Sequence, residues 1–231
     1  MVRESVVLEL EGVSKDYRGL RPLRVDRLRV AAGQQVAVLG MDAMAAEIFV
    51  NLITGATLPD RGRVMAFGRS TADISDSAEW LASVDRFGIA SHRAVLLEEL
   101  DVLQNLAVPF TLDIEPLAEE VIERASALAT EIRLAPSTWA HKVATLDPAS
   151  HARIHVARAL ALEPGILVME HTSAGPTSPD ASALGRDVRA AAARRGAAII
   201  ALTTDTSFAR AVALQTLRWD PASGRLSTER R

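Results

Sequence analysis

Residues 35–55 read QVAVLGMDAMAAEIFVNLITG and carry the strongest fold signal in the chain. The apolar run at 35–39 is typical of a short strand buried on both faces. Residues 43–54 follow with helical spacing and end at Gly55, which predicts a helix directly after the strand. A buried strand that runs straight into a helix is typical of α/β proteins.

Two more apolar runs, at 166–169 and 198–202, are separated by a predicted helix at 181–195. This strand-helix-strand order predicts a parallel sheet. Further strands are expected at 6–13, 23–30 and 63–67, and the tail 220–231 is expected to form a turn and a short edge strand.

Residues 89–160 are predicted to be mostly helical. Pro116 is placed to open one helix, and a second is expected at about 149–162, stopped by Pro164. One apolar stripe of the first helix would be buried: Leu117, Val121, Ile122, Ala125, Leu128 and Ile132. We therefore expect a split α/β core, residues 1–88 and 161–231, with a helical insert at 89–160.

Composition excludes several classes of function. The chain has 231 residues, 48% of them apolar, a net charge of −3 and no cysteine. Disulfides and thiolate metal sites are excluded, and the lack of a long basic run argues against nucleic acid as a partner. The longest apolar stretch contains Asp42, Glu47 and Asn51, which makes it a poor membrane span. We expect a soluble cytoplasmic protein that reaches the inner face of the membrane only through a partner.

The order of these elements, with several short motifs, resembles the ATP-binding subunit of ABC transporters over almost the whole chain. The lipoprotein-release and macrolide-export types are the most similar. The motifs are EGVSKDY (11–17), VAVLG (36–40), NLITG (51–55), LPDRGRV (58–64), ELDVLQNL (99–106) and VARALALEP (156–164). The resemblance implies a P-loop NTPase-like ABC ATP-binding fold, α/β, with a mixed sheet core, an antiparallel β part and a helical insert.

The phosphate loop that the resemblance implies is degenerate. Such a loop needs G-x-x-x-x-G-K-[ST], in which glycine N–H groups and the lysine hold phosphates and the hydroxyl holds magnesium. Residues 40–47 read GMDAMAAE. Gly40 remains, but Ala45 replaces the second glycine, Ala46 the lysine and Glu47 the hydroxyl. The local sequence also suits an ordinary helix that starts near Ala43, capped by Asp42, with no phosphate cradle.

The other positions that the resemblance marks for chemistry have also changed. At the end of the 166–169 strand the family's Asp-Glu pair is replaced by Glu170-His171, and the family's glutamine falls at His92. The switch histidine falls at Thr204. Glu170 could still reach a metal and His171 could in principle act as a base, but an ordinary loop histidine is the stronger interpretation. Tyr17 matches the adenine-stacking aromatic, although packing explains it equally well.

The family's signature segment is replaced by Asp147, Pro148, Ala149 and Ser150 after Leu146. Asp147 adds negative charge and Pro148 removes an N–H donor, yet the pair makes a normal helix start. The D-loop becomes AGPT at 174–177. His151 and His155 have the spacing of a metal pair but lack a visible third ligand, so no metal site is expected.

These losses predict a non-catalytic ABC-type subunit with a structural or regulatory role in a membrane transport complex, without the family's ATP and magnesium. Its partner would be a membrane permease subunit, an intact ABC ATPase subunit or a second copy of the chain. The apolar residues at 96–110 would suit docking of a membrane subunit or packing of the insert. Two alternatives stay open: an ATP-hydrolysing component with atypical motifs, and a soluble protein-interaction module.

Overall fold

The computed structural model describes residues 5–228. Its strands are β1 (Val6–Lys15), β2 (Leu23–Ala31), β3 (Gln35–Leu39), β4 (Arg61–Ala66), β5 (Arg69–Ser70), β6 (Phe87–Ser91), β7 (Ile166–Glu170), β8 (Ala198–Thr203), β9 (Gln215–Asp220) and β10 (Arg225–Thr228). Its α-helices are α1 (Ala43–Ile53), α2 (Ser77–Val84), α3 (Val102–Ala107), α4 (Glu119–Glu131), α5 (Pro148–Leu160), α6 (Ser178–Arg195) and α7 (Thr206–Val212). Short 3-10 helices lie at Thr71–Asp73, Pro136–Thr138 and Val143–Thr145.

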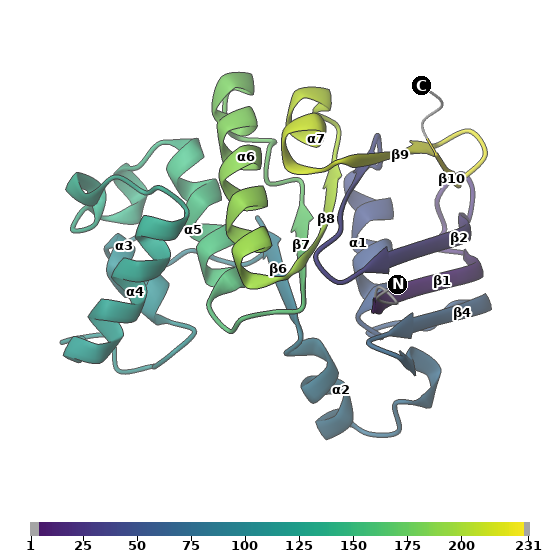
Figure 1. Cartoon of the computed structure of the whole chain (residues 1–231), viewed down its shortest axis with the longest axis horizontal. Helices are drawn as coiled ribbons and strands as arrows, with labels where there is room; N and C mark the ends of the chain where they lie inside the picture. The colour runs from purple at the N-terminus through teal and green to yellow at the C-terminus, as the bar shows by residue number, and fades with distance from the viewer. Residues whose placement is uncertain (1–4, 229–231) are drawn as a thin grey trace.

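The described strands form one mixed sheet in the order β5-β4-β1-β2-β10-β9-β3-β8-β7-β6. Strands β9, β3, β8, β7 and β6 run parallel, as the strand-helix-strand pattern predicts. Strand β1 pairs antiparallel with β2 and β4. The antiparallel strands lie at one end of the molecule and helices α3, α4 and α5 at the other (Figure 1).

The two faces of the parallel strands are both covered. Val36 and Val38 of β3 point into a core that contains Phe49 of α1. The alternate residues Ala37 and Leu39 point into a second core, which contains Phe208 of α7 and the buried residues of α4, α5 and α6. Because successive side chains of a strand point to opposite faces, the continuous apolar run of β3 supplies both cores.

The structure shifts one boundary of the predicted helical insert and the start of one of its helices. Strand β6 extends to Ser91 and pairs with β7, so the expected boundary after residue 88 falls inside a core strand. α-Helices and 3-10 helices together occupy slightly more than half of residues 89–160, and loops and turns occupy most of the remainder. Helix α4 begins at Glu119, not at Pro116, and Ile122 is 38% exposed because it lies to one side of the buried stripe.

The tail also differs from the prediction. Strand β10 is not at an edge: it pairs antiparallel with β9 and parallel with β2. Residues 229–231, the end of the predicted tail, lie outside the described residues. Strands β5, β6 and β9 and helices α2 and α7 were not predicted, since each is short and gives only a weak local pattern.

Candidate functional site

The residues singled out from the sequence gather at the carboxyl ends of the parallel strands. Leu39 of β3 lies opposite Thr203 of β8, and Glu170 of β7 lies opposite both Leu202 of β8 and Ser91 of β6. The segments that begin at Gly40, His171, Thr204 and His92 therefore leave the sheet at one edge. In open α/β sheets this edge is where ligands bind.

Helix α1 begins at Ala43, as the sequence predicts, and Asp42 caps it. The carboxylate Oδ1 of Asp42 accepts the backbone N–H of Ala45 at 2.8 Å. The N–H of Ala46 donates to the Asp42 carbonyl at 2.9 Å, and that of Gly40 to the Thr203 carbonyl at 2.8 Å. Ala45 and Ala46 are fully buried. Donors at 40, 45 and 46 are thus already paired within the protein.

Arg93 joins two carboxylates that lie on different elements. Its Nη1 is 2.8 Å from Oε1 of Glu47 on α1, and its Nη2 is 2.7 Å from Oε2 of Glu170 at the end of β7. Glu170 is 1% exposed. A buried carboxylate needs a partner of opposite charge, and Arg93 is the partner that reaches it. The guanidinium therefore occupies the space between Glu47 and Glu170.

Arg93 is the residue that sequence analysis missed. It lies next to the expected His92, but nothing in the sequence pairs it with Glu170, which is 77 residues away. The sequence offers one indirect signal. If Glu47 and Glu170 lie close together in the fold, their two negative charges require a nearby cation, and Arg93 is a candidate.

His171 has an unusual local environment. Its backbone lies in the left-handed region with φ of 51°, which is uncommon for a residue other than glycine. Its N–H donates to the Leu202 carbonyl at 2.9 Å. The side-chain atoms Nε2 of His171 and Oγ1 of Thr172 are buried without a hydrogen-bond partner in the protein. No carboxylate of the described residues therefore bonds to Nε2 of His171.

Four histidines line one cavity of about 220 Å³: His92, His151, His155 and His171. His151 Nε2 lies 2.7 Å from the Val143 carbonyl, so its ring is already engaged. Burial lowers the pKa of His155 to about 4, and the charges of Arg158, His151 and His92 add to this shift. Among residues 5–228, no three His, Asp or Glu side chains are placed to hold one metal ion.

The segment after β8 is organised around hydroxyl groups and a cap. Thr203 Oγ1 lies 2.7 Å from Ser173 Oγ, which ties the end of β8 to the loop after β7. Asp205 caps α7 by accepting the N–H groups of Ser207 and Phe208 at 2.7 and 3.0 Å. Thr204, the position of the expected switch histidine, is exposed.

Asp147 caps α5, which starts at Pro148 as the sequence predicts. Its carboxylate accepts the Ser150 N–H at 2.9 Å and the Ser150 hydroxyl at 3.0 Å. The Ser150 N–H bond is the main reason why the pKa of Asp147 lies below its usual value. This helix start therefore carries a negative charge, with Ala149 following the proline.

Tyr17 is half-buried and packs against the core that contains α1. Burial raises the pKa of its hydroxyl, and the charge of Asp42 raises it further. The aromatic ring and the helix cap therefore lie near each other, which is compatible with the packing interpretation.

Comparisons with known proteins decide the fold. The dimeric structure of MJ0796, a bacterial ABC transporter cassette, matches with a TM-score of 0.76 and 22% identity, covering 96% of this chain and 97% of that one. CbiO1 of Clostridium perfringens, part of the CbiONQ ABC transporter complex, matches with a TM-score of 0.80 and 18% identity, covering 96% of this chain and 87% of that one. The chain has the ABC ATPase cassette fold.

Curated relatives of the cassette agree with this fold. The lipoprotein-releasing system ATP-binding protein LolD of Chromohalobacter salexigens is 26% identical over 208 residues, covering 88% of this chain and 87% of that protein. The macrolide export ATP-binding/permease protein MacB of Haemophilus ducreyi is 26% identical over 193 residues, covering 81% of this chain and 26% of that protein. No family model matches the chain.

Most of the positions singled out from the sequence lie at one edge of the sheet. Gly40 to Glu47, His92, Glu170, His171 and Thr204 all lie at or just beyond the carboxyl edge of the parallel strands. Asp147 to Ser150 lie apart in sequence, but Pro148 shares the histidine cavity with His171. No helix within residues 5–228 has the length and apolarity that a membrane crossing requires.

Proposed function

We propose that this chain is a non-hydrolysing ABC-type subunit with a structural or regulatory role in a membrane transport complex. The observation that carries the proposal is the N-terminus of α1. There the Asp42 carboxylate takes the Ala45 N–H at 2.8 Å. A helix N-terminus binds phosphate through such N–H groups, so an internal carboxylate competes with the ligand for them.

Electrostatics support the same conclusion. Asp42 and Glu47 place two carboxylates along the first turns of α1, whereas a triphosphate needs cations. Two like charges at about 4 Å repel by roughly 4 kcal/mol at an intermediate effective dielectric. The nearby cation, Arg93, is already engaged by Glu47 and Glu170. Ala46 is fully buried, and its methyl group cannot bind phosphate.

The absence of turnover is supported by the groups around the expected water site. A general base must hold its reactive atom within hydrogen-bond reach of the water and must be oriented for the task. Glu170 is ion-paired with Arg93, and His171 Nε2 is buried with no partner. Thr204 offers a hydroxyl in place of an imidazole.

The role in a complex rests on the relatives. Their names place them in lipoprotein release, molybdate or tungstate import and macrolide export. A chain that keeps this fold fits beside a membrane permease subunit, an intact ABC ATPase subunit or a second copy of itself. It would then lie in the cytoplasm at the inner face of the membrane.

Two measurements test the proposal. The first follows ATP hydrolysis by the purified chain with magnesium, beside a Glu170→Gln variant. We expect no hydrolysis above the no-protein background in either sample. Steady hydrolysis that disappears in Glu170→Gln would establish the ATP-hydrolysing alternative.

The second measurement recovers the tagged chain from detergent-solubilised membranes of its own host. A membrane permease or an intact ABC ATPase subunit is expected to copurify. Recovery of the chain in the soluble fraction alone, free of either partner, would favour the soluble interaction module.

A further inference from the structure

The helical segment between β6 and β7, residues 92–160, shares an apolar core with α6 and the sheet, and two sets of ion pairs add further links between them. The first is the Arg93 bridge, defined as Arg93 with Glu47 and Glu170. The second is the α6 cluster, formed by Glu131, Arg133, Arg153, Asp187, Arg194 and Arg195. Both sets connect elements that are far apart in the sequence.

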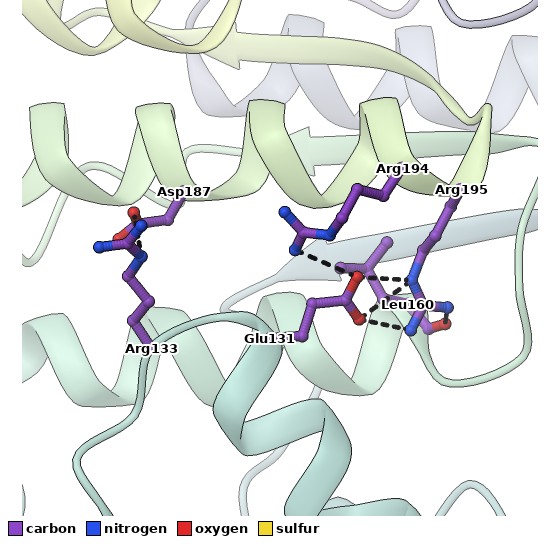
Figure 2. Close-up of polar contacts among 6 residues, drawn as sticks. All are labelled: Glu131, Arg133, Leu160, Asp187, Arg194 and Arg195. Atoms are coloured by element: carbon purple, nitrogen blue, oxygen red, sulfur yellow. Dashed lines mark hydrogen bonds and ion pairs between the residues drawn. The ribbon is translucent and has the colours of Figure 1, made fainter.

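The α6 cluster centres on Glu131 at the end of α4 (Figure 2). Arg195 of α6 donates from Nε to both Glu131 oxygens at 3.1 Å and from Nη2 to Oε2 at 2.5 Å. Its Nη1 also donates to the carbonyl of Leu160 at the end of α5, at 2.8 Å. One arginine therefore fastens both α4 and α5 to α6.

Asp187 provides a second link in the same cluster. It forms ion pairs with Arg133, whose Nε lies 3.1 Å from Oδ1, and with Arg153, whose Nη2 lies 2.9 Å from Oδ2. Arg153 also donates to the Ile132 carbonyl. The side chains of Arg153 and Asp187 are 14% and 13% exposed. The Arg153–Asp187 pair is therefore mostly shielded from solvent and holds its geometry better than an exposed pair does.

The Arg93 bridge acts where the segment leaves the core. Arg93 follows β6 directly, and its two partners lie on α1 and on β7. Removing the guanidinium would leave the Glu170 carboxylate buried without a partner, which is costly. The bridge therefore fixes the first residues of the segment against two core elements at once.

We propose that the Arg93 bridge and the α6 cluster together hold residues 92–160 in one orientation relative to the core without any ligand. Arg93 and Arg195 are the positioning residues. The charges that fix the arrangement belong to the chain itself, so the arrangement does not depend on whether nucleotide binds.

The test measures orientation directly. Because the chain has no cysteine, Arg27→Cys on β2 and Ala127→Cys on α4 give a unique pair of spin labels. Their distance distribution is recorded by pulsed electron paramagnetic resonance in the full chain without nucleotide. We expect a single narrow distribution. It should broaden by about twofold or more when Arg93→Met and Arg195→Met are combined.

Arg69→Met is the matched control. Arg69 also pairs with a glutamate, Glu79 at 2.8 Å, but both lie outside residues 92–160. It should leave the distribution unchanged. A distribution that is already broad in the unmodified chain, or one that stays narrow in the double variant, would overturn the proposal.

A further variant covers the case in which Arg93→Met fails to fold. Arg93→Met combined with Glu170→Met removes the buried carboxylate together with its partner, so the fold should survive. Amide hydrogen exchange at residues 92–101 should still rise about tenfold, because the link from this segment to α1 and β7 is gone. Exchange equal to that of the unmodified chain would contradict a positioning role for Arg93.

Discussion

Asp42 shows how one side chain changes what a helix N-terminus can do. Its carboxylate gives the helix the hydrogen bond that a bound anion would otherwise receive, at the Ala45 N–H. The same group stabilises α1 and repels phosphate. Asp147 does the same at α5, where it takes the N–H of Ser150. At both sites an N-terminal cap occupies a potential anion site.

Asp42→Ala should therefore destabilise the protein. Loss of an N-cap costs about 1 kcal/mol, whereas Asp42→Asn keeps a capping oxygen and should cost less than about 0.5 kcal/mol. Urea unfolding measures both variants. An Asn variant as unstable as the Ala variant would show that the charge of Asp42, and not its hydrogen bond, stabilises α1.

We predict that His155 lowers the free energy of unfolding of the protein in acid. Its pKa is lowered to about 4 in the folded chain, from 6.5 in the absence of burial. Between these values the unfolded chain binds a proton that the folded chain does not, so stability falls as pH drops from 6.5 toward 4. The half-buried ring and solvent screening limit this effect to roughly 1–2 kcal/mol.

His155→Leu removes that contribution while keeping an apolar side chain of similar size. Urea unfolding at pH 7 and pH 5 should show a smaller pH-dependent loss for the variant than for the unmodified chain. An equal loss in both proteins would mean that His155 is not held neutral in the folded state.

At the scale of elements, β6 depends on a close approach to α5. A Cβ at Gly88 would lie 2.1 Å from the Ala159 carbonyl oxygen, a backbone atom that cannot move aside cheaply. Gly88→Ala should cost about 1–3 kcal/mol through overpacking. At Gly175 the nearest contact would be 3.3 Å, to a Pro148 side chain.

Gly175→Ala is thus the matched control, and thermal unfolding compares the two variants. Gly88→Ala should have the lower melting temperature. Equal melting temperatures would show that α5 can shift away from β6 without loss, and would weaken the packing described for this end of the sheet.

The elements that the sequence predicted well are those with a strong local pattern. Strands β3, β7 and β8 are continuous apolar runs, and Asp42 and Asp147 mark helix starts by residue type alone. Strand β6 was missed because Gly88 interrupts a short run, and β10 was placed at an edge because pairing with β2 is a long-range property. Local periodicity reveals neither a strand as short as β6 nor the long-range pairing of β10.

For the whole molecule, the sequence shows which residue types stand at the expected phosphate loop but not which distant residues pair with them. Ala46 and Glu47 stand in the sequence where the resemblance leads one to expect a lysine and a hydroxyl. The Arg93 bridge is not visible in the sequence, since it joins residues from three elements that only folding brings together. The chain has the cassette fold, and its own cap and ion pairs engage polar groups at the carboxyl edge of the parallel strands.

The central claim is that a nucleotide triphosphate does not bind at the N-terminus of α1. Isothermal titration of the purified chain with ATP and magnesium tests it most directly, beside a variant that combines Asp42→Asn with Glu47→Gln. This variant keeps the cap and removes both charges. We predict no measurable binding up to about 1 mM ATP for the unmodified chain, a limit near −4 kcal/mol. Micromolar binding by the unmodified chain would contradict the account.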